Sequence, residues 1–147
     1  MDADRKAPVF SEGRIEIAAS AEGLWDLMAD IERWPSWNPD VREASVLGDI
    51  AEGTRFRWKA GPGTITSTLR MVDRPRAIGW TGRIFGIAAI HVWRFETRGD
   101  VTVASMEESF DGLVARLFRR RLQQQLDATT RAGLENLKSV AEQRSST

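Results

Sequence analysis

The chain contains no cysteine, only one histidine, and no tyrosine that could act as a general acid. Without cysteine, the protein has no disulfides, no thiolate metal ligands and no thiol nucleophile. A single histidine, His91, cannot build a multi-histidine metal site and would have to serve any Ser-His-Asp arrangement. The sequence also lacks a Gly-x-Ser-x-Gly elbow and a His-Glu-x-x-His helix. We therefore expect no metal site and no cofactor.

An excess of charge of one sign is also missing. Lys and Arg together number 21, as do Asp and Glu, so the formal net charge is zero. Without a positive field over the whole chain, we do not expect nucleic acid as a partner. Four arginines lie close together, and we interpret them as a solvated helix face whose methylene groups also cover apolar surface. They are Arg116, Arg119, Arg120 and Arg121.

Long hydrophobic runs are absent as well. The longest uncharged apolar run covers residues 84–90, far short of the ~20 residues that a membrane-spanning helix needs. Residues 1–8 carry charges where an export signal would be apolar. We expect a cytoplasmic protein without a membrane span. Its 147 residues fit a single domain, 1–147, with flexible ends at 1–8 and 143–147.

The hydrophobic pattern of the first forty residues predicts one strand and two short helices. Residues 14–17 alternate between polar and apolar, as a half-buried strand does. Ser20 then offers an N-cap, apolar residues recur at helical spacing as far as Ile31, and Pro35 ends the pattern. From about Val41 to Phe110 the period changes to two, with regular turn residues, which predicts six strands in a meander.

A long C-terminal helix is predicted to pack on this sheet. No proline occurs from about 111 to 142, and apolar residues recur every three or four positions, which predicts a helix of roughly 45 Å. Within the strands, Phe56 and Trp58 share one face while Arg55 and Arg57 share the other. We predict an α+β fold in which a curved seven-stranded antiparallel sheet wraps around the long helix. The curvature would leave a cavity between the two.

Five motifs resemble those of a known family. They are ASAEGLW at 19–25, DIERWPSWNP at 30–39, GTRFRW at 53–58, RPRAIGW at 74–80 and ESFDGL at 108–113. With these motifs the chain resembles, over nearly its whole length, the START-like helix-grip superfamily (SRPBCC) and its polyketide cyclase/dehydrase-type bacterial branch. The resemblance implies a deep apolar cavity that holds a small hydrophobic molecule, and it implies an enzyme only conditionally.

The candidate ligand-binding residues are the large side chains assigned to the apolar sheet face and the helix. In the Trp34–Trp37 turn, the indoles plug the end of the sheet, place one ring with its N–H donor in the cavity, or do both. Gly61-Pro62-Gly63 is interpreted as a hairpin tip near the cavity mouth. The complete candidate set is Trp34, Phe56, Trp58, Leu69, Trp80, His91, Trp93, Met106, Glu108, Phe118 and Leu122.

His91 and Glu108 are the candidate catalytic pair. Gly99-Asp100 is a two-residue hairpin signal that sets His91 opposite Glu108, with Cβ atoms about 4.5–5.5 Å apart on the apolar face. Either the two side chains simply satisfy each other, or the carboxylate orients the ring for a ligand or a proton. In this register Glu107 points to solvent near Arg94, whereas a bulge would turn Glu107 inward.

Three functions remain open from the sequence. The first is a carrier or sensor of a small apolar or aromatic ligand that is lipid-, polyketide- or quinone-like. The second is a cyclase-, dehydratase- or isomerase-type enzyme that uses His91 and Glu108 in the same cavity. The third is an apolar groove that accepts a partner protein. The oligomeric state is also open, with a homodimer as one option.

Overall fold

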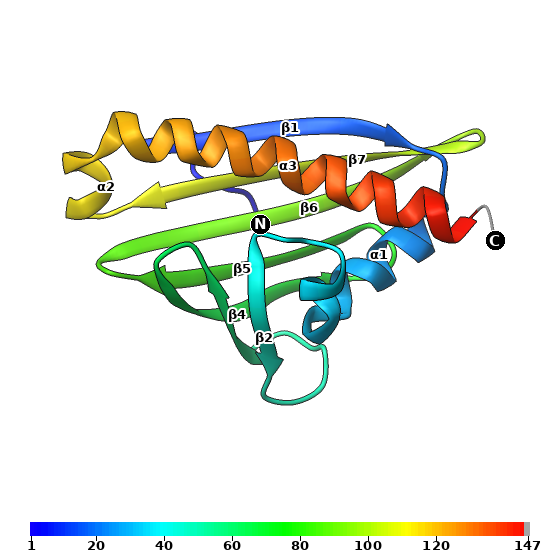
Figure 1. Ribbon diagram of the computed structural model, residues 1–147, viewed down its shortest axis with the longest axis horizontal. Helices are drawn as coiled ribbons and strands as arrows, with labels where there is room; N and C mark the ends of the chain where they lie inside the picture. Colours follow the sequence, from blue (N-terminus) through cyan, green and yellow to red (C-terminus); the bar gives the residue numbers. More distant parts are fainter. Residues whose placement is uncertain (146–147) are drawn as a thin grey trace.

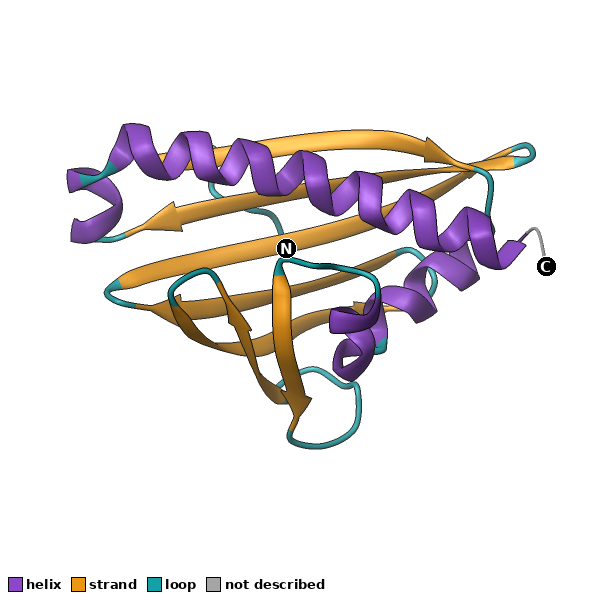
Figure 2. Cartoon of the chain, viewed as in Figure 1, coloured by secondary structure: helices purple, strands orange, loops and turns teal. Residues whose placement is uncertain are grey.

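A seven-stranded antiparallel sheet curves around a long C-terminal helix in the computed structural model, which describes residues 1–145 (Figures 1 and 2). The strand order β1-β7-β6-β5-β4-β3-β2 places β1 at one edge and β2 at the other. The predicted α+β fold and the six-strand meander after the short helices are confirmed. The strands are β1 (Val9–Ile17), β2 (Val41–Val46), β3 (Arg55–Ala60), β4 (Gly63–Asp73), β5 (Ala77–Ile84), β6 (Ile87–Arg98) and β7 (Val101–Asp111).

Two short helices connect β1 to β2, as predicted. They are α1 (Ala21–Ala29) and the 3-10 helix η1 (Ile31–Ser36), which contains Pro35. The Ser20 hydroxyl accepts a hydrogen bond from the Gly23 amide and so caps α1.

A bidentate salt bridge joins α1 to the turn after β4. The Arg74 guanidinium donates to both carboxylate oxygens of Asp26, at 2.8 and 2.9 Å, and lies over the Trp25 ring. The hydrogen bond from Arg74 lowers the pKa of Asp26. Because the folded-state pKa is depressed, this pair stabilises the fold above the unfolded pKa and loses its contribution as the pH falls through the folded value. Solvent screens the pair, so its contribution is small.

The C-terminal helix is broken where the sequence predicted continuity. It divides into α2 (Leu113–Leu117) and α3 (Arg119–Ser145), with Phe118 at the junction. Gly112, at φ +109°, is the N-cap of α2 and lies against the carbonyl of Gly86, and Phe118 leaves the helical conformation at φ −111° and ψ 31°.

α3 packs on β1 and, less extensively, on β7. A methyl group at Gly13 of β1 would lie 2.9 Å from the Leu134 side chain, so this glycine lets α3 approach closely. The buried face of α3 comprises Leu126, Thr130, Gly133, Leu134, Leu137 and Ala141.

The first residues of the chain are packed on the sheet, although residues 1–8 were expected to be flexible. The Ala3 amide donates to Glu107 and the Asp4 amide to Ser109, both on β7. Glu107 pairs with Arg94 at 3.0 Å, as expected, but it is only 8% exposed because the N-terminal segment covers it. The expectation that Glu107 faces solvent is therefore wrong. At the other end α3 extends to Ser145, and residues 146–147 of the expected flexible tail lie outside the described residues.

None of the helices in residues 1–145 is long and apolar enough to cross a membrane.

The backbone contact between Gly112 and Gly86 predicts that a side chain at position 112 lowers the free energy of unfolding. A Cβ at Gly112 would overlap the Gly86 carbonyl oxygen, and φ +109° is a glycine conformation. Gly99→Ala is the matched control, because Gly99 also has positive φ, +61°, but open space around it. We expect Gly99→Ala to cost about 1 kcal/mol and Gly112→Ala several-fold more in urea denaturation. Equal costs would show that backbone strain alone matters at Gly112.

Candidate functional site

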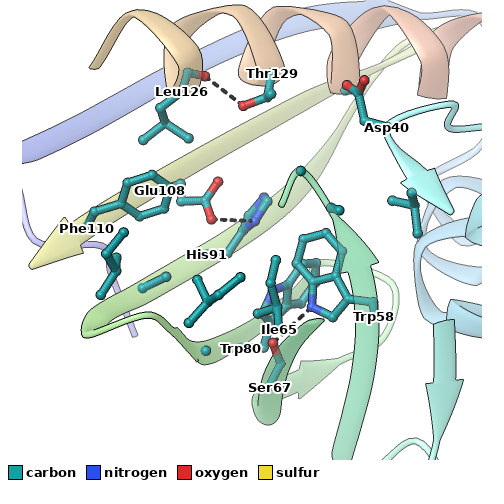
Figure 3. A pocket seen from close by; sticks show the side chains of 18 of the residues that line it. Asp40, Trp58, Ile65, Ser67, Trp80, His91, Glu108, Phe110, Leu126 and Thr129 are labelled. Atoms are coloured by element: carbon teal, nitrogen blue, oxygen red, sulfur yellow. Dashed lines mark hydrogen bonds and ion pairs between the residues drawn. The ribbon is translucent and has the colours of Figure 1, made fainter. Parts of the chain in front are cut away.

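A cavity of about 300 Å³ lies between the curved sheet and α3, and its walls are mostly aromatic and aliphatic. Figure 3 shows Trp58, Trp80 and Ile65 on the sheet side, with Leu126 and Thr129 of α3 across from them. Five of the six tryptophans of the chain line this cavity, all except Trp25.

Eight of the eleven candidate ligand-binding residues line the cavity. They come from η1, from β3, β5, β6 and β7, and from α3, so the fold gathers them from across the chain. These residues are Trp34, Trp58, Trp80, His91, Trp93, Met106, Glu108 and Leu122.

The other three candidates lie elsewhere. Phe56 and Leu69 face inward as expected, but they are fully buried in the core and do not reach the cavity. Phe56 stands behind the wall, with its ring edge-on to Trp34 and Trp80 at centroid distances of 5.6 and 5.7 Å. Phe118 lies at the break between α2 and α3, where it is 53% exposed and not part of the lining.

Both tryptophans of the Trp34–Trp37 turn line the cavity, and their indole nitrogens differ. The Trp34 Nε1 donates to the Met28 carbonyl at 2.9 Å, so this ring both plugs the corner and forms part of the wall. The Trp37 Nε1 is buried and has no hydrogen-bond partner among the described residues. Trp37 was not among the candidate residues, although the sequence motif pointed to one of the two rings as a donor in the cavity. Spacing alone could not tell which nitrogen a backbone carbonyl would satisfy.

The predicted β6–β7 register is confirmed. His91 pairs with Glu108, and Trp93 with Met106, on neighbouring strands. The His91 Nδ1 lies 3.3 Å from the Glu108 Oε2, and the two side chains point toward each other in Figure 3. His91 is 8% exposed and lies between the rings of Trp80 and Trp93, at centroid distances of 4.6 and 6.0 Å.

The pair is close but not fully hydrogen-bonded. The Nδ1 atom of His91 lies near the Glu108 carboxylate without a directed hydrogen bond to it, and neither ring nitrogen has a hydrogen-bond partner within the described residues. A buried polar atom without a partner costs roughly 1–3 kcal/mol. The Nε2 atom of His91, which faces away from this contact, has no hydrogen-bond partner in the described part of the chain.

Residues of two hairpin tips belong to the cavity lining. Gly61 and Pro62, from the β3–β4 tip, belong to the lining, in line with the interpretation of this segment. Arg83 and Phe85, at the β5–β6 tip, lie beside them. A methyl group at Gly63 would lie 2.9 Å from the Phe85 ring, so the two tips are in contact.

No group of three or more His, Asp or Glu side chains that could hold a metal ion occurs within residues 1–145.

A family model covers most of the chain. Residues 10–142 match the family described as polyketide cyclase / dehydrase and lipid transport. The chain belongs to this family.

Solved structures share the fold at low sequence identity. A hypothetical protein from Helicobacter pylori has a TM-score of 0.83 at 13% identity, over 93% of this chain and 90% of that one. A START superfamily protein from Mycobacterium smegmatis has a TM-score of 0.79 at 16% identity, over 91% and 97%. The Zhui aromatase/cyclase from Streptomyces sp. R1128 has a TM-score of 0.75 at 18% identity, over 92% and 94%. At these identities the likeness shows the fold alone.

We predict that a small side chain at Gly133 raises the free energy of unfolding. This glycine is in the middle of α3 and lines the cavity, where an added Cβ would meet Trp93 and Met106 at an ordinary 3.8 Å. Because alanine is a better helix former than glycine, we expect Gly133→Ala to raise the unfolding free energy by about 0.5–1 kcal/mol. Thermal and urea denaturation measure it. A destabilised variant would show that the cavity wall at this point is already fully packed.

Proposed function

We propose that the protein binds a small apolar molecule with an aromatic or polycyclic core in the cavity. The observation that supports this proposal is the lining itself, in which five indoles and several aliphatic side chains surround a space of about 300 Å³. Pockets of this size and character are typical of small-molecule sites. The family description, which includes both polyketide cyclases and lipid transport, is consistent with such a ligand.

The shape and polarity of the walls favour a flat, oxygenated ligand over a simple alkyl chain. Indole faces stack on flat rings, and these contacts add to the free energy of burial. The polar groups of the lining include the Trp37 indole nitrogen, His91 and Glu108. A ligand hydroxyl or carbonyl could accept from the Trp37 Nε1 or pair with His91. We therefore favour polyketide- or quinone-like chemistry within the broader class of hydrophobic ligands.

Burial alone would give only modest affinity. Covering ~300 Å² of apolar ligand surface contributes roughly 7 kcal/mol before the cost of association, which corresponds to micromolar binding or weaker. The hydrogen bonds to Trp37 and His91 would then decide which ligands bind tightly.

Binding can be tested with 2-naphthol as a flat probe that carries one hydroxyl group. Because five tryptophans line the cavity, we expect 2-naphthol to change the tryptophan fluorescence saturably and to raise Tm. In Gly133→Leu the longer side chain would occupy the cavity, and we expect at least a tenfold loss of affinity. Gly133→Ala is the control, because its Cβ fits, and we expect less than a threefold change.

Native mass spectrometry of the freshly purified protein is the complementary measurement. A co-purifying hydrophobic molecule that is lost in Gly133→Leu would support the proposal. A failure of 2-naphthol and of a broad set of aromatic probes to bind, together with an empty wild-type protein, would contradict it.

A second candidate function is proton-transfer catalysis in the same cavity. The observation that favours it is the His91 ring, which has a carboxylate oxygen 3.3 Å from Nδ1 and no partner at Nε2 in the described part of the chain. Glu108 would hold the Nδ1 proton and orient the ring. The Nε2 atom would then accept a proton from an acidic C–H bond of the ligand and return it at a second position.

Deuterium exchange separates the two candidates. The probe is 2-tetralone, a bicyclic ketone with exchangeable protons next to its carbonyl group, incubated with the protein in D₂O. If the cavity catalyses proton transfer, we expect exchange to be faster with the wild type than with His91→Gln or Glu108→Gln, while 2-naphthol still binds all three. Equal exchange rates would leave binding as the function of the site.

A further inference from the structure

The end of the molecule that carries α2 exposes an apolar patch. Four large apolar side chains are exposed there, Phe85 by 66%, Leu113 by 71%, Leu117 by 69% and Phe118 by 53%. Figure 1 shows α2 and the β5–β6 turn at the same end, and the backbone contact between Gly112 and Gly86 joins them. We call these four residues the α2-end patch. Contiguous exposed apolar residues are unusual on a monomer and typically mark an interaction site.

Phe85 occupies a position where stability would favour another residue. It forms, with Gly86, the two-residue turn between β5 and β6, and both have positive φ, +48° and +75°. Turns of this type favour Asn-Gly or Asp-Gly, because a bulky residue is strained at positive φ. The chain nevertheless places a phenylalanine there and exposes it. Because Phe85 strains the turn and its side chain is exposed at the tip, this residue indicates a role in binding.

Positive charge surrounds the patch although the whole chain is neutral. Residues 112–126 contain four arginines and no acidic residue. Asp4 and Asp111 line the same surface depression as Arg116 and Arg119, so they partly compensate those two charges. Arg120, Arg121 and Arg83 have no carboxylate within ion-pair distance in residues 1–145. All three are exposed.

We propose that the α2-end patch docks on an anionic lipid bilayer. Apolar tips inserted at headgroup level, with arginines beside the lipid phosphates, are the two components of interfacial membrane binding. The small size of the patch favours this partner over a protein, since it contains four large apolar side chains whereas each side of a stable protein interface uses about 20–30 residues. The charge favours it too, because the uncompensated side chains are all cationic.

Docking in this orientation brings part of the cavity lining close to the membrane. Phe85 belongs both to the patch and to the cavity lining, and Leu122 of the lining is one helical turn from Phe118. A hydrophobic molecule could then pass between bilayer and cavity without crossing water. The docking itself goes beyond the proposed function and does not depend on which ligand the cavity holds.

Vesicle flotation tests this proposal with the full chain. The vesicles contain phosphatidylcholine with or without phosphatidylglycerol, and we expect the wild type to float only with the anionic vesicles, less so as salt rises. Leu117→Gln with Phe118→Gln should abolish flotation. Arg120→Gln with Arg121→Gln should weaken it by about fivefold for each arginine removed. Phe85→Asn should reduce flotation while the hairpin keeps or gains stability, which thermal denaturation measures.

Matched controls remove the same chemistry from other surfaces. Leu47 is 63% exposed in the β2–β3 loop, so Leu47→Gln removes an exposed leucine outside the patch. Arg55→Gln with Arg57→Gln removes two exposed positive charges from the outer face of β3. Both controls should float like the wild type.

Three results would overturn the proposal. One is that the wild type fails to float with anionic vesicles at low salt. Another is that the controls lose flotation as much as the patch variants. The third is a dimer in analytical ultracentrifugation that disappears in Leu117→Gln with Phe118→Gln, because a second copy would then cover the patch. Binding of 2-naphthol is measured separately, so a failure of docking does not count against the proposed ligand-binding function.

Discussion

The packing of α3 along one edge of the sheet determines where the cavity lies. Gly13 on β1 leaves room for Leu134, so the helix lies close to β1 and β7. The other strands curve away beneath it and carry large indoles toward the resulting space. Because interiors pack densely, a space of about 300 Å³ persists only where rigid elements prevent collapse. The edge contact and the sheet curvature together supply that rigidity.

The polar atoms inside the cavity have a cost that the rest of the fold must offset. The Trp37 indole nitrogen and both ring nitrogens of His91 are buried without well-directed partners in the described residues. In contrast, the indole nitrogen of Trp34 is satisfied, because it donates to the Met28 carbonyl. Two tryptophans three residues apart therefore differ in their indole nitrogens. The nitrogen without a partner, that of Trp37, belongs to the wall where the proposed ligand would lie.

The sequence predicted best what local chemistry determines. Gly99-Asp100 fixed the hairpin, and from it followed the pairing of His91 with Glu108 across the whole length of β6 and β7. The errors arose where tertiary contacts decide. Phe118 fits the helical period, but its backbone, at φ −111° and ψ 31°, interrupts the helix between α2 and α3. Phe56 alternates correctly, yet alternation cannot distinguish a cavity wall from the core behind it. The burial of Glu107 depends on a segment about one hundred residues earlier in the sequence.

Three residues that local rules disfavour are all located on the lining of the cavity. Gly133 weakens the middle of α3, Phe85 strains a turn, and His91 buries unsatisfied nitrogens. Each could be replaced by a residue that suits its local structure better, alanine, asparagine and an apolar side chain respectively. Such local conflicts are expected at functional positions, because a sequence optimised only for stability would remove them. Their shared location on one lining is what the proposed binding role of the cavity requires.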